Sequence, residues 1–167
     1  MRTLLIAGAL AALVVSLAAC GGSSASSTSA QAVERQADLY AIDQIEKNFH
    51  KATSQHDINL MMSLWAPNAT LTFGPGKTAA GKQEIRSLWL NDSKVFQSAI
   101  HWISDTAAYK IRITVNGDRG TLHFECHYLD AKTGKLEAVT GADQDVARIN
   151  GQWLITNMIG ATTTLSI

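Results

Sequence analysis

The sequence predicts an α+β fold in which three N-terminal helices pack on a curved, mainly antiparallel β-sheet. In the first half of the chain, apolar residues recur at steps of three and four, which is typical of amphipathic helices. From Ala99 onward, apolar and polar residues alternate, which indicates strands. Two pairs, Asn116-Gly117 and Asn150-Gly151, favour type I′ hairpin turns between those strands. Helices that precede such a sheet must cover one of its faces.

The N-terminus has the features of an export signal followed by a lipid attachment site. The apolar run from Leu4 to Ala19 follows a basic start and is too short to predict a stable membrane span. Residues 17–21, Leu-Ala-Ala-Cys-Gly, resemble the lipobox of bacterial lipoproteins, in which the cysteine is diacylated. We therefore predict a signal peptide over residues 1–19, a lipidated Cys20 and an extracytoplasmic protein anchored to a bacterial cell membrane, on its periplasmic or outer-surface side.

Residues 20–32 predict a flexible tether that is rich in Gly and Ser, and residues 33–167 predict one domain. Removing the first 19 of 167 residues leaves 148, which is enough for one core and too few for two. Fourteen basic residues balance fourteen acidic ones, so we predict no nucleic-acid partner. If Cys20 is acylated, Cys126 has no intramolecular partner, and we predict no disulfide.

Three helices are predicted before the sheet. The first runs from about residue 33 to 54, and Asp57 suits the N-cap of a second helix that stops at Pro67, since the residue before proline avoids the helical region. The third begins at Gly81 with an acid in its first turn. The apolar positions of these helices are Leu39, Ile42, Ile45, Phe49, Ala52, Ile58, Met61, Met62, Trp65, Ile85, Leu88 and Trp89.

A brief strand, residues 70–73, is predicted before the third helix and ends at the turn Gly74-Pro75-Gly76. Four long strands are predicted after it. They span about residues 99–104 continuing into 108–115, then 120–129, 136–149 and 152–159. Sequential hairpins of this kind form an antiparallel meander.

The strand from Thr121 to Asp130 carries most of the candidate functional residues. One of its faces holds Leu122, Phe124, Cys126 and Tyr128, and the other holds His123, Glu125 and His127 at a spacing of about 6 to 7 Å. In the simplest interpretation this polar face meets water, and in the alternative some of these groups line a pocket. Cys126 has apolar neighbours on its face, so we predict a small buried hydrophobe and not a reactive thiol.

Five motifs along the chain resemble one known family. They are Gln55-His56-Asp57, the segment 64–69 (Leu-Trp-Ala-Pro-Asn-Ala), the helix start 81–85, His101, and the segment 148–155 (Arg-Ile-Asn-Gly-Gln-Trp-Leu-Ile). Over about residues 35–160 their order resembles the SnoaL-like branch of the nuclear transport factor 2-like superfamily, which includes scytalone dehydratase. The resemblance implies a cone, in which a bent sheet wraps a long helix and leaves a mostly apolar pocket at the open end.

The resemblance also implies site residues. In the dehydratases of this branch, two histidines, an aspartate and an asparagine work in the pocket, and His101 and His127 match the two histidines. The aspartate position falls on Ser54 and the asparagine position on Ala142, beside Asp143, so the chain departs from the pattern at two of four positions. The implied site therefore has His101 and His127 as acid-base groups. Its ligand-binding residues would be Glu125, Asp143, Ser54 and Trp65.

The sequence contains two other groupings of titratable residues. His123, Glu125 and His127 are ligand types that suit a zinc or iron site, but a third imidazole would have to come from elsewhere, so we predict no metal and no cofactor. His50 and His56 have polar neighbours on and just after the first helix, and we expect both at the surface.

Two functions from different classes follow. The first is the binding of a small apolar molecule in the cone-shaped pocket. The second is a cofactor-independent lyase or isomerase of the dehydratase type that uses His101 and His127 for acid-base catalysis. If His127 lies inside the cone, the apolar residues of its strand lie outside, and we expect a homodimer that buries them.

Overall fold

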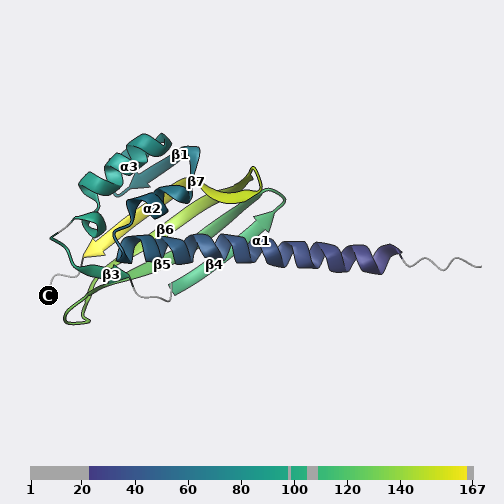
Figure 1. The fold of residues 1–167 in the computed structure, drawn as a ribbon, viewed down its shortest axis with the longest axis horizontal. Coiled ribbons are helices and arrows are strands. Elements are labelled where there is room, and N and C mark those ends of the chain that lie inside the picture. Colours follow the sequence, from purple (N-terminus) through teal and green to yellow (C-terminus); the bar gives the residue numbers. More distant parts are fainter. Residues whose placement is uncertain (1–22, 98, 105–108, 165–167) are drawn as a thin grey trace, which may run out of the picture.

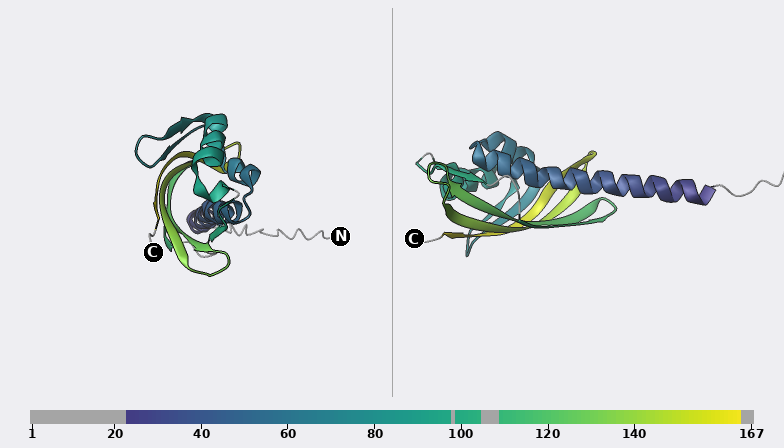
Figure 2. Two further views of the ribbon diagram at one scale, coloured as in Figure 1. Left: turned by 90° about the vertical axis from the view of Figure 1, so that its left-hand side faces the viewer. Right: turned by 90° about the horizontal axis from the view of Figure 1, so that it is seen from below.

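The computed structural model describes residues 23–97, 99–104 and 109–164, and it consists of one long helix lying in a curved, seven-stranded sheet. Helix α1 (Ser23–Ser54) crosses the concave side of the sheet, and its N-terminal part extends beyond the strands (Figure 1). In the view along α1, the sheet curls around the helix (Figure 2). The predicted α+β class and its curved sheet are confirmed.

The sheet has the order β2-β1-β7-β6-β5-β3, and β4 also pairs with β5. Every pair is antiparallel except β1 with β7, which is parallel. The strands are β1 (Trp65–Phe73), β2 (Thr78–Ala80), β3 (Trp102–Ser104), β4 (Tyr109–Asn116), β5 (Arg119–Asp130), β6 (Leu136–Ile149) and β7 (Gln152–Thr164). The first long strand of the prediction is thus two strands, β3 and β4, that pair with different halves of β5.

Helix α1 is buried over a wide arc of its circumference. The predicted apolar stripe is at most 3% exposed at Ile42, Ile45, Phe49 and Ala52. A second stripe of polar residues, Glu46, His50 and Thr53, is at most 4% exposed. A flat sheet would cover one stripe of a helix, whereas a sheet that curls around the helix covers both. The prediction that His50 lies at the surface is therefore wrong.

Arg148 and Asp38 attach α1 to the β6–β7 hairpin. Arg148 Nη2 lies 2.6 Å from Asp38 Oδ2, and the indole Nε1 of Trp153 donates to Asp38 Oδ1 at 3.1 Å. The guanidinium of Arg148 also lies over the ring of Trp153, 5.2 Å from its centroid. This arrangement fixes the position of α1 along the sheet, so that the residues near its C-terminus face β3 and β5.

Helix α2 (Ile58–Ser63) begins where the sequence predicts. The Oδ1 atom of Asp57 accepts hydrogen bonds from the backbone N–H groups of Asn59 and Leu60, both at 2.9 Å. The helix ends earlier than expected, because Trp65 already pairs with Ile155 of β7. A register shift after Trp65 interrupts the β1–β7 pairing, and an interrupted pairing is where a strand tolerates a proline.

Helix α3 (Gly81–Asp92) and the short 3₁₀ helix η1 (Lys94–Phe96) cover the sheet beside β1. Trp89 of α3 is 1% exposed, and its ring centroid lies 5.6 Å from that of Phe49, 5.8 Å from Phe73 and 5.9 Å from Phe96. Aromatic clusters of this kind contribute both buried area and edge-to-face attraction. They hold α3 and α1 on opposite sides of one core.

The two predicted hairpin turns differ in the structure. Asn150 and Gly151 both have positive φ, 51° and 79°, as a type I′ turn requires. In the other hairpin, Asn116 pairs with Arg119, so the loop residues are Gly117 and Asp118. Only Gly117 has a positive φ there, 59°, which is the pattern of a type II′ turn.

The predicted signal peptide and Cys20 lie outside the described residues. Helix α1 begins at Ser23 and not near Val33, so the tether predicted over residues 20–32 is wrong for 23–32. Residues 29–37 are exposed, and Ala, Gln and Glu, which propagate a helix well, recur among them. Within the described residues, no helix has the length and hydropathy needed to cross a membrane.

Candidate functional site

Strand β5 has an apolar and a polar face, as its alternation predicts, but the faces are turned opposite to the expectation. The side chains that point toward α1 are at most 2% exposed, and they are Leu122, Phe124, Cys126 and Tyr128. The rings of Phe124 and Phe49 meet edge to face with their centroids 5.4 Å apart. His127 therefore lies on the outer face of the sheet, since burying the aromatic side chains decides the orientation. The expectation that His127 lines the cone is wrong.

The outer-face groups are engaged with one another. His123 Nδ1 lies 2.6 Å from Asp143 Oδ1, and the ring of His127 stacks on Tyr109 with centroids 3.9 Å apart. Glu125 Oε1 accepts a hydrogen bond from Lys110 at 2.7 Å, which holds the pKa of the Glu125 carboxyl below its usual value. These contacts are those of a partly exposed polar strand, which was the simplest interpretation of this sequence.

The two predicted catalytic histidines do not meet. His101 is exposed, and its backbone carbonyl accepts a hydrogen bond from the N–H of Ala131. Ala131 lies four residues along the chain from His127, which corresponds to roughly 13 Å along a strand. Among the described residues, no group of three or more His, Cys, Asp or Glu side chains could hold a metal ion.

The remaining predicted ligand-binding residues have structural contacts. Ser54 Oγ accepts from the backbone N–H of Ser104 at 2.8 Å and lies 3.3 Å from the Ser104 carbonyl, so it joins the end of α1 to β3. Trp65 is 0% exposed and belongs to the core. Asp143, whose side chain is 74% exposed, and Glu125 lie on the outer face of the sheet and not inside the cone.

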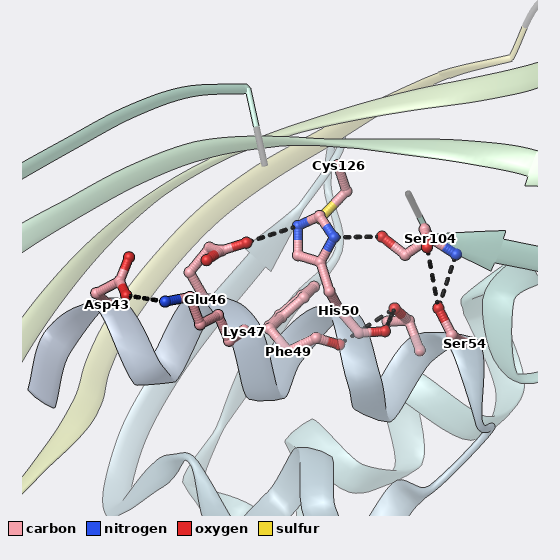
Figure 3. Close-up of polar contacts among 9 residues, drawn as sticks. Asp43, Glu46, Lys47, Phe49, His50, Ser54, Ser104 and Cys126 are labelled. Carbon is pink, nitrogen blue, oxygen red and sulfur yellow. Dashed lines mark hydrogen bonds and ion pairs between the residues drawn. The ribbon is translucent and has the colours of Figure 1, made fainter. Parts of the chain in front are cut away.

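A buried polar cluster instead surrounds His50 (Figure 3). Its Nδ1 lies 2.6 Å from Ser104 Oγ, and its Nε2 lies 3.2 Å from Cys126 Sγ and 3.4 Å from Glu46 Oε1. The imidazole thus bridges α1, β3 and β5 inside the core. We call His50, Glu46, Ser104 and Cys126 the His50 cluster.

The His50 cluster continues to Tyr128. Burial raises the pKa of the Cys126 thiol beyond its usual range, and burial likewise raises the pKa of Tyr128, so both groups are neutral. The side chains of Cys126, Thr53 and Thr140 lie around the Tyr128 hydroxyl and act on its pKa. A protonated thiol is a poor nucleophile, which agrees with the structural role predicted for Cys126.

A cavity of about 170 Å³ lies beyond Tyr128, at the end of the sheet opposite the projecting part of α1. Its walls combine four aromatic rings with several hydroxyl groups, and two charged side chains lie at its exposed side. The lining residues are Phe73, Trp89, Asp92, Ser93, Lys94, Val95, Trp102, Tyr128, Thr140, Thr162 and Thr164. Tyr128 therefore belongs to both the cavity wall and the network that leads to the His50 cluster.

Trp89, one of the residues that line the cavity, carries a buried donor. Its Nε1 is inaccessible to solvent and has no hydrogen bond to any described residue. A buried N–H group left unpaired costs about 1–3 kcal/mol. Thr140 and Thr162, by contrast, satisfy each other through a 2.7 Å contact between their hydroxyl oxygens.

Sequence reasoning missed the His50 cluster and the cavity. The signal for the first was the spacing of Glu46, His50 and Ser54, which places all three on one helical stripe. The cavity gave no local signal, since its walls come from separate segments. Trp89 was assigned to the core, and Phe73 and Trp102 to strands, without any indication that their rings leave a space between them.

The sequence model of the SnoaL-like domain matches residues 34–159. The chain belongs to the SnoaL-like family. No curated protein matches it. The family assignment confirms the resemblance drawn from the motifs, while the placement of the histidines shows that the pocket of this member is built from other residues.

Solved structures with the same fold share little sequence with this SnoaL-like domain. An NTF2-like protein with a cystatin-like fold from Novosphingobium aromaticivorans is 16% identical, with a TM-score of 0.70 over 84% of this chain and 91% of that one. The hexachlorocyclohexane dehydrochlorinase LinA-type3 from Novosphingobium barchaimii is 16% identical, with a TM-score of 0.65 over 80% and 94%. A protein of unknown function from Nostoc punctiforme is 17% identical, with a TM-score of 0.63 over 75% and 91%. At these identities the comparisons establish the fold alone.

Proposed function

We propose that this SnoaL-like domain binds a small, largely apolar molecule in the cavity beside Tyr128. The observation that carries the proposal is a lining that combines aromatic rings with a few hydroxyl groups. Apolar pockets with a few well-placed polar groups are the usual form of a small-molecule site. The aromatic rings would supply the affinity, and the hydroxyl groups would orient the ligand.

The size of the cavity limits the ligand to about one ring. An apolar cavity of roughly 150 Å³ accommodates benzene, and this one measures about 170 Å³. Burying roughly 150 Å² of an aromatic ring at about 25 cal/mol per Å² contributes on the order of 4 kcal/mol. That value corresponds to a dissociation constant of roughly 1 mM before any polar contact is added.

The test uses the full chain in non-ionic detergent and three one-ring probes, which are benzyl alcohol, benzamide and benzoate. Ligand-observed NMR should detect binding of at least one probe to the wild type. Val95 is 4% exposed and lines the cavity, so Val95→Phe should fill it and abolish binding while the fold is retained. Val115→Phe, at a site that does not line the cavity, is the matched control. If the wild type binds none of the probes at millimolar concentration, the proposal is wrong.

A second candidate is a cofactor-independent lyase or isomerase, and one observation favours it. Tyr128 of the cavity wall neighbours Cys126, and Cys126 Sγ lies 3.2 Å from His50 Nε2, beside Glu46. Such a network could carry a proton to or from a ligand in the cavity. The dehydrochlorinase name of one similar structure also describes an elimination, which supports testing this chemistry.

The lyase candidate is tested by proton exchange with acetophenone in D₂O. Acid-base chemistry in the cavity should accelerate deuterium incorporation into the acetophenone methyl group, as followed by NMR. Both His50→Gln and Tyr128→Phe should then lose this acceleration, and His127→Gln on the outer face should keep it. Exchange by the wild type at the rate of buffer alone would leave ligand binding as the only function.

We also propose that the domain is held at a membrane by acyl chains on Cys20. Its support is the lipobox-like segment 17–21 and the apolar run before it. Two or three acyl chains anchor a protein without a spanning helix, because each buried methylene contributes about 0.8 kcal/mol. Cys20→Ala should release the folded domain from membranes in fractionation, and retention after a high-salt wash would contradict the anchor.

A further inference from the structure

The exposed side of the cavity carries a cation without an acidic partner in the described part of the chain. Asp92 forms an ion pair with Lys77, which neutralises the acid at this edge. Lys94 forms no ion pair with any described residue. Its Nζ lies 5.9 Å from the centre of the Trp102 ring, so a cation–π contact holds it over the cavity wall. The net charge of this edge is therefore positive.

The interior of the cavity favours an aromatic ring. Phe73, Trp89 and Trp102 present ring faces and edges, which attract another aromatic group more strongly than an aliphatic one of equal area. A ligand that satisfies both the aromatic walls and the cation at the edge has one ring and a negative charge at the end that faces solvent.

We propose that the cavity selects a small aromatic carboxylate, with its ring between the three aromatic side chains and its carboxylate near Lys94. This inference rests on the proposed function and adds the chemical class of the ligand. Charge complementarity at Lys94 distinguishes a carboxylate from a neutral ring compound of the same shape. The strength of that preference depends on the Lys77–Asp92 pair, because the negative charge of Asp92 near Lys94 disfavours an anionic ligand unless Lys77 neutralises it.

The preference is measured with benzoate and benzamide, which have nearly the same shape and differ in charge at pH 7. For the full chain in detergent at low ionic strength, NMR titration should give a dissociation constant about fivefold lower for benzoate, as one partly exposed ion pair supplies. Raising the salt to about 0.5 M should reduce the difference, because screening weakens the pair. Cyclohexanecarboxylate should bind more weakly than benzoate, since it lacks the aromatic ring.

Two substitutions at the cavity edge should shift benzoate affinity in opposite directions. Lys94→Gln removes the cation and should weaken benzoate binding about fivefold. Asp92→Asn removes the nearby acid and should strengthen it by about twofold or more. Benzamide affinity should stay constant in both variants, and Lys51→Gln, which removes an exposed lysine of α1, should change neither probe. All three substituted residues are exposed, so the fold should survive these changes.

Each outcome separates the two proposals. Opposite shifts for benzoate alone support the aromatic carboxylate. Equal affinity for benzoate and benzamide, with no response to Lys94→Gln, overturns the ligand class and leaves small-molecule binding intact. If neither probe binds to the wild type and Val95→Phe changes nothing, the cavity is not a ligand site, and both proposals are wrong.

Discussion

Two histidine–carboxylate pairs of this protein lie in opposite environments. In the core, His50 Nε2 lies 3.4 Å from Glu46 Oε1, and the two side chains are 5% and 2% exposed. On the outer face of the sheet, His123 Nδ1 lies 2.6 Å from Asp143 Oδ1, where the Asp143 side chain is 74% exposed. The outer pair is the closer one, yet water surrounds it and replaces its partner at little cost.

For the contribution of such a pair to stability, burial should matter more than the distance between the two groups. Exposed ion pairs contribute about 0–1 kcal/mol to stability. Removing one member of a buried pair costs about 3–5 kcal/mol, because the other is left in a low-dielectric core without its partner. The sequence alone does not indicate which of the two pairs is buried. The difference in burial arises because the sheet curls around α1 and covers His50 and Glu46.

The largest expected effect comes from a lysine on the inner face of the sheet, compared with a lysine at an exposed position. Phe124→Lys puts an ammonium group against Phe49 in the core and should abolish cooperative folding at 25 °C, as followed by circular dichroism. Ile159→Lys, at a residue that is 57% exposed, should change the free energy of unfolding by about 0.5 kcal/mol or less. A folded Phe124→Lys monomer would show that the apolar face of β5 is the outer one, as a sheet-mediated dimer requires.

Strand β5 also shows what the sequence could predict about the fold. Alternation determined which side chains share a face, and all seven residues from Leu122 to Tyr128 are grouped as predicted. It does not determine which face meets the helix. The resemblance to dehydratases favoured an inward His127, but the buried area of Phe124 and its neighbours outweighs it. The homodimer stays a prediction, but the apolar face of β5 no longer supports it, because that face is buried against α1.

The polar stripe of α1 shows why the site was harder to predict than the fold. A pattern of Glu46, His50 and Ser54 on one side of a helix is typical of a solvated face, and most such stripes are exposed. Its burial depends on a sheet whose curvature is set by the pairing of seven strands from distant parts of the sequence. Curvature is a property of the assembled sheet, so no window of this sequence encodes it. The cavity has the same origin, since it is the space that the curved sheet leaves beside α3.

The second expected effect compares the two pairs directly. Glu46→Gln keeps the shape of the side chain and replaces one carboxyl oxygen in the core by an amide NH2, and we expect a loss of about 1–3 kcal/mol in the free energy of unfolding by urea. Asp143→Asn is the matched change in the outer pair and should cost less than about 1 kcal/mol. Equal losses in the two variants would mean that burial does not distinguish the pairs.

A third effect distinguishes the inner face of the sheet from the outer one, and it is a loss of stability at alkaline pH. Burial raises the pKa of both Cys126 and Tyr128, so above pH 9 to 10 the unfolded chain loses their protons while the folded chain keeps them. Each group should then lower the free energy of unfolding by about 1.4 kcal/mol per pH unit. This stability is fully present below pH 9 and is lost as the pH rises.

The control for the alkaline effect is a change that does not titrate. Cys126→Ser and Tyr128→Phe should each make the decline with pH shallower, whatever they do to stability at pH 7. Phe124→Leu should lower stability by a similar amount at every pH and leave the slope unchanged. A slope that persists in the double variant of Cys126 and Tyr128 would assign the alkaline unfolding to other groups.

The smallest expected effect concerns the outer face. His127 stacks on Tyr109 and lies 3.7 Å from Glu125, both contacts at a partly exposed surface, so His127→Gln should cost less than about 1 kcal/mol. It should also leave the affinity for benzoate unchanged, because His127 faces away from the cavity on the opposite side of β5. His50→Gln makes the same replacement of an imidazole by an amide, but in the core. It should lower stability by several times as much, since the neighbours Glu46 and Ser104 would lose a partner there. If His127→Gln were the more damaging of the two, or if it weakened ligand binding tenfold, the outer face would carry the function and the cavity would not.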